Sequence, residues 1–520
     1  MSTESQHHHV PFAVSPRRRV AASLLMLTAF VGVIAAATLC AAGRYSEAAA
    51  AAAAMIALAF IFAARVSIES ILTVWFAATP LASYFIRFPV DKSIVTFDRA
   101  AIALAVIVLL LKIKRTDAEA RSCTAISKFE IAWALLSVIA LASALVQSND
   151  VTYASRIAID SFWLPLAAFH LARYHFDARG RAGLIIISAI AVGLFLFATG
   201  AYELATGANL FPYKGSELVR EGELRVNGPF AADASYSIIC LLLAVFLIAA
   251  PRAFNARLDR AAQFVLRTAI AAAIAASLFP LFRAVAAALI FCLIVLRIAA
   301  SRDAQTRRRI DATTNESTDS VIDSPFSHTN SAVAASARLR VSRSLLAIIL
   351  LAAAIGFIMF GPYSLERRLT DPRNAYGRLA TWEAAAEMAL EHPLAGVGLA
   401  NYHDYFHAKY NWHTEAFEAV MFTRAADSPH SNFLWIAADL GLIALALYIA
   451  AYLFLFKMGY AALRKAASEQ QRPAAACFIA LVVAYLIPGL TLASGYYSDL
   501  NLYFFFMLGL LSNKFLVSGS

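Results

Sequence analysis

The chain has 520 residues; 61% of them are hydrophobic and only 15% carry a charge. A soluble globular protein has about 25% charged residues, so a chain of this length and composition cannot cover a surface that faces water. The composition therefore excludes a soluble enzyme, a disordered protein and a nucleic-acid-binding protein, despite the net charge of +10. Five cysteines are too few for a disulfide scaffold. The class that remains is a polytopic helical membrane protein.

Apolar runs along the chain predict where it crosses the membrane. A span needs about 20 mostly apolar residues to cross ~30 Å of hydrocarbon, and its backbone polar groups must be paired within the segment, so each span is expected to be a helix. The pattern predicts an all-α bundle of about 12–14 spans. The runs lie at residues 20–42, 46–64, 67–87, 99–112, 130–147, 157–173, 183–204, 231–250, 264–281, 284–299, 344–361, 431–456, 474–493 and 499–513.

Basic residues predict the orientation of these spans. Arg17, Arg18 and Arg19 precede the first long apolar run, and no clear cleavage site follows, so this run is expected to be a retained span rather than a signal peptide. Placing the tail of residues 1–19 in the cytoplasm puts most of the lysines and arginines of the short loops on the same side. With an even number of spans, both termini are then cytoplasmic.

Two long polar segments interrupt the hydrophobic pattern. Residues 301–343 are rich in Ser, Thr, Asn, Asp and Arg, and they predict a disordered cytoplasmic linker. Residues 362–430 are expected on the outer face and to be partly helical, with a helix over 378–391 that Pro393 ends. Because the rest of this loop is rich in aromatic residues, it must pack either on the bundle, as a lid-like cap, or on a ligand.

One histidine precedes the apolar run at 431–456. Asp427 or Ser428 suits a helix N-cap and Pro429 the first helical position, which would place His430 in the first turn at the outer surface. The positive end of the helix dipole favours a neutral imidazole there, and that imidazole can accept a proton. The alternative is that His430 merely caps the helix or binds a loop carbonyl.

Two arginines lie at the outer face, against the general distribution of basic residues. Arg225 precedes the span at 231, and Arg283 lies at the break between two short spans. A guanidinium group can bind a phosphate or diphosphate through two parallel hydrogen bonds. The alternatives are contact with lipid headgroups or a structural pair with a carboxylate such as Asp233.

The sequence predicts no metal site and no cofactor. The outer loops contain no Asp-x-Asp pair, and His403, His407 and His413 lie among aromatic residues, where histidines more often pack or form hydrogen bonds than bind metal. The chain also contains no Walker motif and no dinucleotide-binding glycine motif.

Four motifs in fixed order resemble the O-antigen ligase/polymerase superfamily of bacterial membrane glycosyltransferases. The resemblance covers roughly residues 220–450, and the weaker matches are Arg225 with Gly228-Pro229-Phe230, and Arg283, which Phe282 and Ala284 flank where the family usually has Ser and Gly. The four motifs are Arg378-Leu379-Ala380-Thr381-Trp382, Pro393-Leu394-Ala395-Gly396-Val397-Gly398, Pro429-His430-Ser431-Asn432-Phe433-Leu434 and Asp439-Leu440-Gly441-Leu442-Ile443.

The resemblance implies a GT-C-like protein of the bacterial inner membrane with a periplasmic active site. It implies metal-independent, inverting transfer of a glycan from undecaprenyl diphosphate to an acceptor hydroxyl on lipid A-core, another glycan or a protein. His430 would then be the catalytic base, and Arg225, Arg283 and Arg378 would bind the diphosphate. The implied organisation is N-terminal spans at 20–219, the ligase-like region at 220–450 and C-terminal spans at 451–520.

Alternative functions remain open from the sequence. Within the superfamily, the protein is expected to be a ligase, a polymerase or a protein O-oligosaccharyltransferase. Outside it, the alternatives are a transporter or flippase for a lipid-linked glycan, and a structural membrane protein. A transporter predicts internal repeats and charges at mid-span, whereas this chain has no evident repeat and few charges within its spans.

Overall fold

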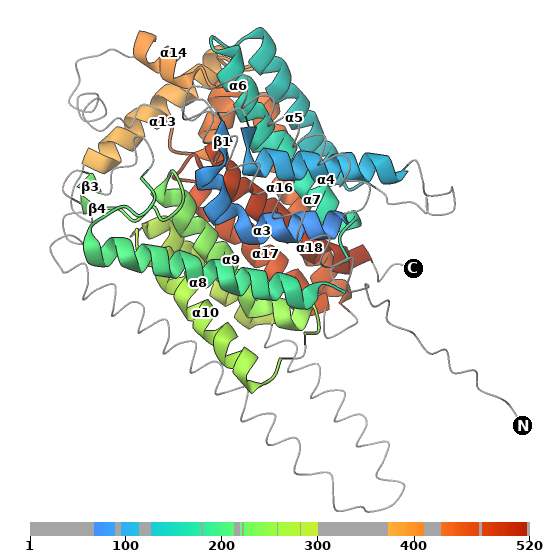
Figure 1. The fold of residues 1–520 in the computed structure, drawn as a ribbon. Helices are drawn as coiled ribbons and strands as arrows, with labels where there is room; N and C mark the ends of the chain where they lie inside the picture. Colours follow the sequence, from blue (N-terminus) through green and yellow to red (C-terminus); the bar gives the residue numbers. More distant parts are fainter. Residues whose placement is uncertain are drawn as a thin grey trace, which may run out of the picture.

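The fold is a bundle of helices with very little strand (Figure 1). The predicted spans at 20–42, 46–64 and 344–361, the tail at 1–19 and the linker at 301–343 lie outside the residues that the structure describes. The structure is a computed structural model that describes residues 67–88, 95–113, 126–177, 180–212, 219–220, 223–256, 258–280, 282–299, 373–409, 428–466 and 471–516.

Every predicted apolar run within the described ranges forms helix. By length and composition, six of the described helices can cross a membrane: α5, α8, α9, α10, α16 and α17. The prediction of an all-α polytopic membrane protein is therefore confirmed. The long helices are α3 (Ile68–Phe85), α4 (Phe97–Ile113), α5 (Lys128–Val146), α8 (Ala182–Thr206), α9 (Asp233–Ala253), α10 (Arg260–Leu278), an unlabelled helix at 283–299, α16 (Asn432–Lys465), α17 (Gln471–Gly489) and α18 (Ser498–Leu516).

Short elements complete the bundle. The segment after α5 consists of α6 (Val151–Ala158), a π-helical turn η2 (Ile159–Trp163) and α7 (Leu164–Tyr174), and a 3-10 turn η4 (Ser494–Tyr496) precedes α18. Two antiparallel pairs of two-residue strands lie in helix connections. They are β1 (Arg87–Phe88) with β2 (Val95–Thr96), and β3 (Val219–Arg220) with β4 (Glu223–Leu224).

Helix α9 is the centre of the bundle. Its apolar window is 89% buried, and it packs against α8, α10, α17 and α18. Helices at the periphery expose large apolar side chains instead, such as Ile187, Phe264 and Leu453. Such exposure is unfavourable in water but suits a surface in contact with lipid tails, which are as apolar as leucine. The burial pattern therefore agrees with a protein that lies within a bilayer.

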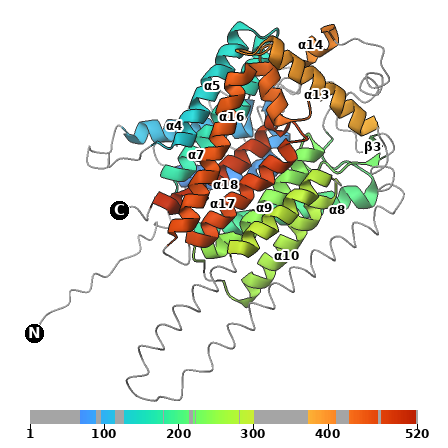
Figure 2. The same ribbon diagram turned by 180° about the vertical axis from the view of Figure 1, so that it is seen from behind.

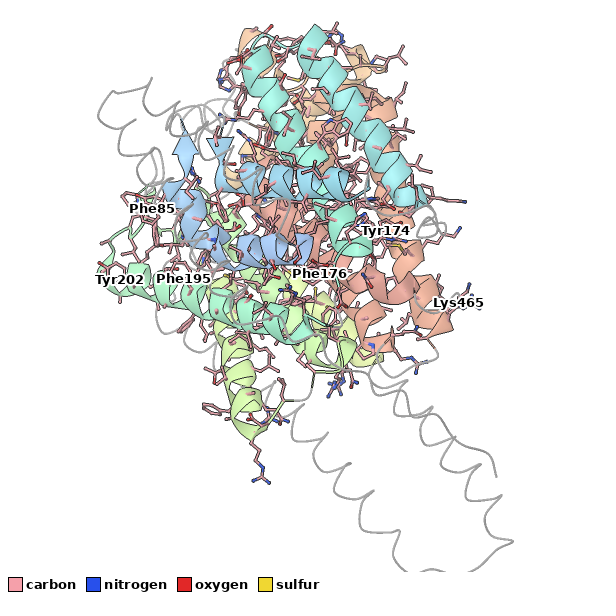
Figure 3. The ribbon with its side chains drawn as sticks, turned by 45° about the vertical axis from the view of Figure 1, so that its right-hand side comes forward. Phe85, Tyr174, Phe176, Phe195, Tyr202 and Lys465 are labelled. Carbon is pink, nitrogen blue, oxygen red and sulfur yellow. The ribbon has the colours of Figure 1, made fainter. Side chains whose placement is uncertain are left out.

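The helices alternate between two ends of the bundle. In Figure 3, Phe85 at the end of α3 and Tyr202 near the end of α8 lie toward one side, whereas Tyr174 at the end of α7 and Lys465 at the end of α16 lie toward the other. Helices α13 (Arg373–Glu391) and α14 (Tyr402–Lys409) lie across the top of the bundle in Figures 1 and 2, beside α6. We call residues 373–409 the cap. The cap belongs to the segment predicted to be periplasmic.

Candidate functional site

The cap is joined to a break in α16. Gly441 has φ 83° and ψ 177°, so the helical backbone is interrupted there. The carbonyls of Ala438 and Asp439, just before the break, accept hydrogen bonds from the backbone N–H groups of Val397 (2.8 Å) and Gly398 (3.0 Å). A helix break leaves carbonyls without their usual partners, and an unpaired buried carbonyl is costly. The cap therefore provides the partners that allow α16 to break at this position.

Two glycines allow the cap and the break to approach each other. Gly396 has φ +68°, and a Cβ on it would lie 2.5 Å from the Ala438 carbonyl oxygen. A Cβ on Gly441 would lie 2.8 Å from the Leu394 carbonyl oxygen. Both distances are too short for a side chain, and both backbone conformations favour glycine. The two glycine-containing motifs of the sequence therefore contact each other directly.

The same stretch of the cap also binds the C-terminal end of α5. The Leu399 N–H donates to Ser143 Oγ (3.0 Å), and Asn401 Nδ2 donates to the Gln147 carbonyl (2.9 Å). Asn401 Oδ1 accepts from the backbone N–H of Asn149 (3.0 Å). One polar segment thus connects two transmembrane helices, α5 and α16, and both hold it in place.

A small apolar core fixes the rest of the cap. Met388 of α13 and Tyr402 and Phe406 of α14 are buried together against Ala438 of α16. The Tyr402 hydroxyl donates to the Thr381 carbonyl at 3.0 Å, which ties α14 to α13. For this part of the predicted loop 362–430, the expectation that aromatic side chains pack on the bundle as a cap is confirmed.

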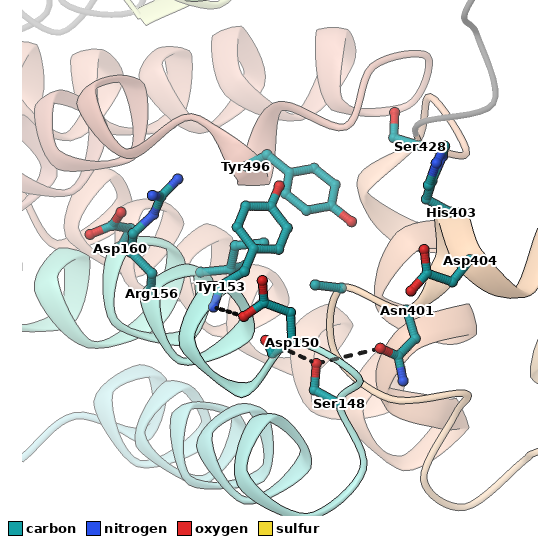
Figure 4. Close-up of a pocket in the computed structure, with 12 residues that line it drawn as sticks. Ser148, Asp150, Tyr153, Arg156, Asp160, Asn401, His403, Asp404, Ser428 and Tyr496 are labelled. Carbon is teal, nitrogen blue, oxygen red and sulfur yellow. Dashed lines mark hydrogen bonds between the residues drawn. The ribbon is translucent and has the colours of Figure 1, made fainter. Parts of the chain in front are cut away.

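A polar cavity of about 660 Å³ lies between the cap, α6 and η4 (Figure 4). Side chains from segments far apart in the sequence reach it together. Neither His430 nor any of the three predicted arginines lines it, so the cavity and the predicted site are separate features of the molecule. Its lining residues are Ser148, Asp150, Tyr153, Arg156, Ile157, Asp160, Ala400, Asn401, His403, Asp404, Ser428 and Tyr496.

Charged groups at the cavity are partly paired. Asp160, in the π-helical turn, binds the guanidinium of Arg99 from α4 through two contacts of 2.7 and 2.5 Å. The guanidinium carbon of Arg156 lies 5.4 Å from the centre of the Tyr153 ring. Asp404 accepts from Asn149 Nδ2 at 3.1 Å. Sequence reasoning missed this cavity, because residues 148–160 carry no motif and come together with the cap only through packing.

The structure corrects the position of His430. Helix α16 begins at Asn432, and its N-cap is Ser431, whose side chain makes no capping hydrogen bond. The N-cap predicted at Asp427 or Ser428 is therefore wrong by three or four residues. His430 lies before the helix, half-buried, with a left-handed backbone (φ 47°) that cannot belong to an α-helix. His430 is nevertheless close in sequence to a residue of the polar cavity, because Ser428 lines that cavity.

Asn432 fixes the start of α16. Its side chain is fully buried; Nδ2 donates to Ser494 Oγ (2.8 Å), and Oδ1 accepts from the Gly495 N–H (2.8 Å). In the next turn of the helix, the Trp435 ring lies 4.3 Å from the ring of Tyr496, which lines the cavity. An asparagine at the start of an apolar run was the only signal in the sequence for this anchor.

The structure places two of the predicted arginines near enough for their charges to interact. Burial, together with the nearby positive charge of Arg283, lowers the pKa of the Arg378 guanidinium. Arg378 is half-buried on α13, and Arg283 is exposed at the start of the helix at 283–299. Among the described residues, the ion pairs involve neither arginine. We call Arg283 and Arg378 the arginine pair.

The third predicted arginine has a carboxylate partner. Arg225 Nη1 lies 3.5 Å from Oδ2 of Asp233, in the first turn of α9, as the structural alternative anticipated. Buried Glu203 holds the adjacent backbone, because its Oε2 accepts from the N–H groups of Asn227 (3.0 Å) and Gly228 (2.9 Å). The Arg225 Nε is buried and has no hydrogen-bond partner among the described residues.

The histidines of the cap pack against each other. The rings of His403 and His407 lie 4.4 Å apart in an edge-on arrangement, and His413 lies outside the described residues. In the part of the chain that the structure describes, no group of three or more His, Cys, Asp or Glu residues is placed to hold a metal ion. The expectation of a metal-independent reaction stays a prediction.

Comparison with known families identifies the region that contains these features. A family model described as O-antigen ligase matches residues 231–449, which include the arginine pair, the cap, His430 and the break in α16. No curated protein matches the chain. With its apolar helices, the match supports a multi-pass membrane protein. The match over residues 231–449 supports a place for this region in the O-antigen ligase-related superfamily.

Proposed function

We propose that the protein transfers a glycan from undecaprenyl diphosphate to an acceptor hydroxyl at the periplasmic face of the bacterial inner membrane. The match of residues 231–449 to the O-antigen ligase family model supports a glycosyltransferase. The acceptor is lipid A-core in a ligase, another glycan in a polymerase, or a protein in an O-oligosaccharyltransferase, and the chemistry at the donor is the same in each.

The arginine pair is the observation that carries this proposal. Like charges close together repel each other, and burial of Arg378 strengthens the repulsion by removing water. A bound dianion offsets that repulsion, and guanidinium groups match the oxygens of a diphosphate in geometry and charge. The pair lies in the region expected to be periplasmic, where a donor diphosphate at the membrane surface is within reach.

The proposed reaction is a single displacement. The acceptor oxygen forms a bond to the anomeric carbon of the donor sugar, and the bond from that carbon to the diphosphate oxygen breaks. The electron pair leaves with undecaprenyl diphosphate, and His430 accepts the acceptor proton. Arg283, Arg378 and the free Nε of Arg225 stabilise the negative charge that grows on the leaving group. A single displacement inverts the anomeric configuration.

The backbone at His430 supports its role as the base. A left-handed conformation costs a non-glycine residue about 1–2 kcal/mol, and such strained residues cluster at functional sites. The anchored Asn432 maintains the conformation by fixing the start of the helix two residues later. The backbone that carries the imidazole is therefore fixed by the start of the helix.

The test removes one cation at a time from the arginine pair. Arg283→Gln and Arg378→Gln should each raise the KM for the undecaprenyl-diphosphate-linked glycan about 10–100-fold in proteoliposomes, since each removes charge-assisted hydrogen bonds of about 1.5–3 kcal/mol. Arg283→Lys should restore only part of the loss, because a point charge does not replace a planar fork.

Lys409→Gln is the matched control. Lys409 is a cation of the same cap, and Glu391 neutralises it in an exposed ion pair. Its loss should leave transfer unchanged. Wild-type donor KM in both arginine variants would remove the arginine pair from donor binding. Transport of the lipid-linked glycan across the membrane without any glycosyl transfer would instead favour a flippase.

A further inference from the structure

We propose that the polar cavity between the cap, α6 and η4 binds the sugar of a glycan acceptor. This inference rests on the proposed function, because it assigns the acceptor of the same reaction. The proposed occupant is a hydroxyl-rich, uncharged or weakly charged saccharide, and the cavity is a binding site distinct from the arginine pair.

The size and lining of the cavity suit a saccharide. A volume of about 660 Å³ lies within the range of ~300–1,000 Å³ for pockets that enclose small ligands. Carboxylates such as Asp150 and Asp404 accept hydrogen bonds from hydroxyl groups, and Asn401 and Ser428 can both donate and accept. In Figure 4 the rings of Tyr153 and Tyr496 stand on one side of the cavity and offer flat surfaces to the C–H face of a sugar ring.

The charge of the cavity disfavours the donor diphosphate. Arg99 offsets the charge of Asp160. Asp150 and Asp404 then outnumber Arg156, the one arginine or lysine among the lining residues. A diphosphate placed here would be repelled, whereas the arginine pair attracts it. The arginine pair therefore suits the donor of a glycosyl transfer, and the polar cavity suits the acceptor.

The cavity adjoins the proposed base. Ser428 lines it two residues before His430, and the Tyr496 ring contacts the tilted ring of Trp435, near the start of α16. An acceptor sugar bound there would extend toward the start of α16, where its hydroxyl must lose a proton. Sequence proximity and this ring contact thus link the cavity to the residue that would deprotonate its ligand.

The walls of the cavity are joined before any ligand binds. Ser148 Oγ donates to the Leu399 carbonyl (3.0 Å), and Asn149 Nδ2 donates to Asp404 (3.1 Å), so the α5–α6 connection and the cap are tied together. A site that is already ordered loses less conformational entropy on binding. A weakly binding neutral sugar gains most from such a site.

Protection of a cysteine from labelling tests the proposal directly. Ser428→Cys is made in a background with the five native cysteines replaced by alanine, and a water-soluble maleimide measures its accessibility. The probes are two delipidated saccharides, a lipopolysaccharide core oligosaccharide and an O-antigen repeat oligosaccharide, with undecaprenyl diphosphate in micelles for comparison. One of the saccharides at saturation should slow the labelling of Ser428→Cys at least tenfold, and undecaprenyl diphosphate should not.

Glu383→Cys is the control, because Glu383 is exposed on α13 and does not line the cavity. Its labelling should be the same with every probe. Protection of Ser428→Cys by undecaprenyl diphosphate and not by either saccharide would make the cavity a donor site and overturn the proposal. Protection by no probe would overturn it as well, since a sugar site must be occupied at saturation.

Kinetics provide a second measurement. Tyr153→Leu and Asp404→Ala should raise the KM for the glycan acceptor about tenfold and leave the KM for the lipid-linked donor unchanged. An equal effect on both constants would indicate general damage and contradict the proposal. If the arginine variants fail to alter donor binding but the saccharide still protects Ser428→Cys, the cavity stands and the donor assignment fails.

Discussion

The arginine pair and the polar cavity differ in how their charges are balanced. The positive charge of Arg283 acts on Arg378 and helps to lower its pKa, and none of the described ion pairs involves either of them. At the cavity, Asp160 is paired with Arg99, Asp404 accepts from Asn149, and carboxylates outnumber cations. The first feature is complementary to a multivalent anion and the second to a neutral polyol.

In our proposal, this difference in charge separates the donor from the acceptor. A lipid diphosphate and a saccharide differ most in charge. A positively charged site and a negatively charged site can therefore discriminate between them, even if neither fits the shape of its ligand closely. The cap contributes to both features, because α13 carries Arg378 and the segment from Ala400 to Asp404 lines the cavity. Substitutions can test whether the two features act independently. The positions chosen are His430, the glycines, Asn432 and Arg225.

The largest effect on glycan transfer is expected at His430, the proposed base, which belongs to neither the arginine pair nor the polar cavity. His430→Ala should lower transfer about 10²–10⁴-fold, the usual contribution of a general base. Binding of the donor and protection of Ser428→Cys by the saccharide should persist, since neither depends on the imidazole. Activity is measured as radiolabelled glycan moved to acceptor in proteoliposomes.

His392→Ala is the control for that change. His392 lies on the cap, and its Nε2 is 3.0 Å from the Tyr405 hydroxyl in an exposed hydrogen bond. It should retain near wild-type transfer. Normal product from His430→Ala would exclude His430 as the base, whatever the two binding features do.

A second change should disturb both features at once. Gly396→Ala places a Cβ 2.5 Å from the Ala438 carbonyl oxygen at a backbone with φ +68°. We expect a loss of about 2–4 kcal/mol in stability from strain and displacement of the cap, seen as a lower Tm in detergent. Donor and acceptor KM should then rise together, because the cap contributes to both features.

Gly183→Ala is the matched glycine control, since a Cβ there meets nothing within 4 Å and the position is helical. It should leave Tm unchanged or raise it slightly. A Gly396→Ala protein with wild-type Tm and unchanged constants would show that the contact between the cap and the break in α16 is not needed to hold either feature.

An intermediate effect is expected at Asn432, which positions His430 without contacting substrate in our proposal. Asn432→Ala removes the hydrogen bonds to Ser494 and Gly495 and should cost about 1–3 kcal/mol in stability. It should also lower kcat about 10–100-fold with little change in either KM, because the base is misplaced while both binding features remain. A purely structural role predicts the lower Tm with kcat unchanged in the folded fraction.

The smallest effect is expected at Arg225, whose partial exposure weakens its pair with Asp233 to about 0–1 kcal/mol. Arg225→Gln should raise donor KM about three- to tenfold, whereas Asp233→Asn should leave it unchanged or lower it by releasing the guanidinium. Equal small losses of stability in both variants, with donor KM unaltered, would show that Arg225 serves only the ion pair.

Some features of the fold followed directly from local sequence. The helix predicted over 378–391 appears in α13 and ends at Glu391, shortly before Pro393, because proline cannot continue a helix. The sequence showed the two glycine-containing motifs, but their direct contact depends on backbone groups about 40 residues apart in the chain. The start of α16 was misplaced because capping preferences near Ser428 are local, whereas the buried amide of Asn432 bonds residues that lie 62 and 63 positions later in the chain.

Hydropathy alone determined that this chain is a polytopic helical membrane protein, because bilayer thickness and backbone hydrogen bonding leave few other solutions for such a sequence. The residue motifs alone also indicated its superfamily. Only the tertiary structure decided that Arg283 lies near Arg378, that Arg225 pairs with Asp233, and that α6, the cap and η4 enclose a polar cavity. The distance between two charged side chains and the shape of a cavity depend on how helices from distant parts of the sequence pack together. No periodicity along the chain encodes that packing.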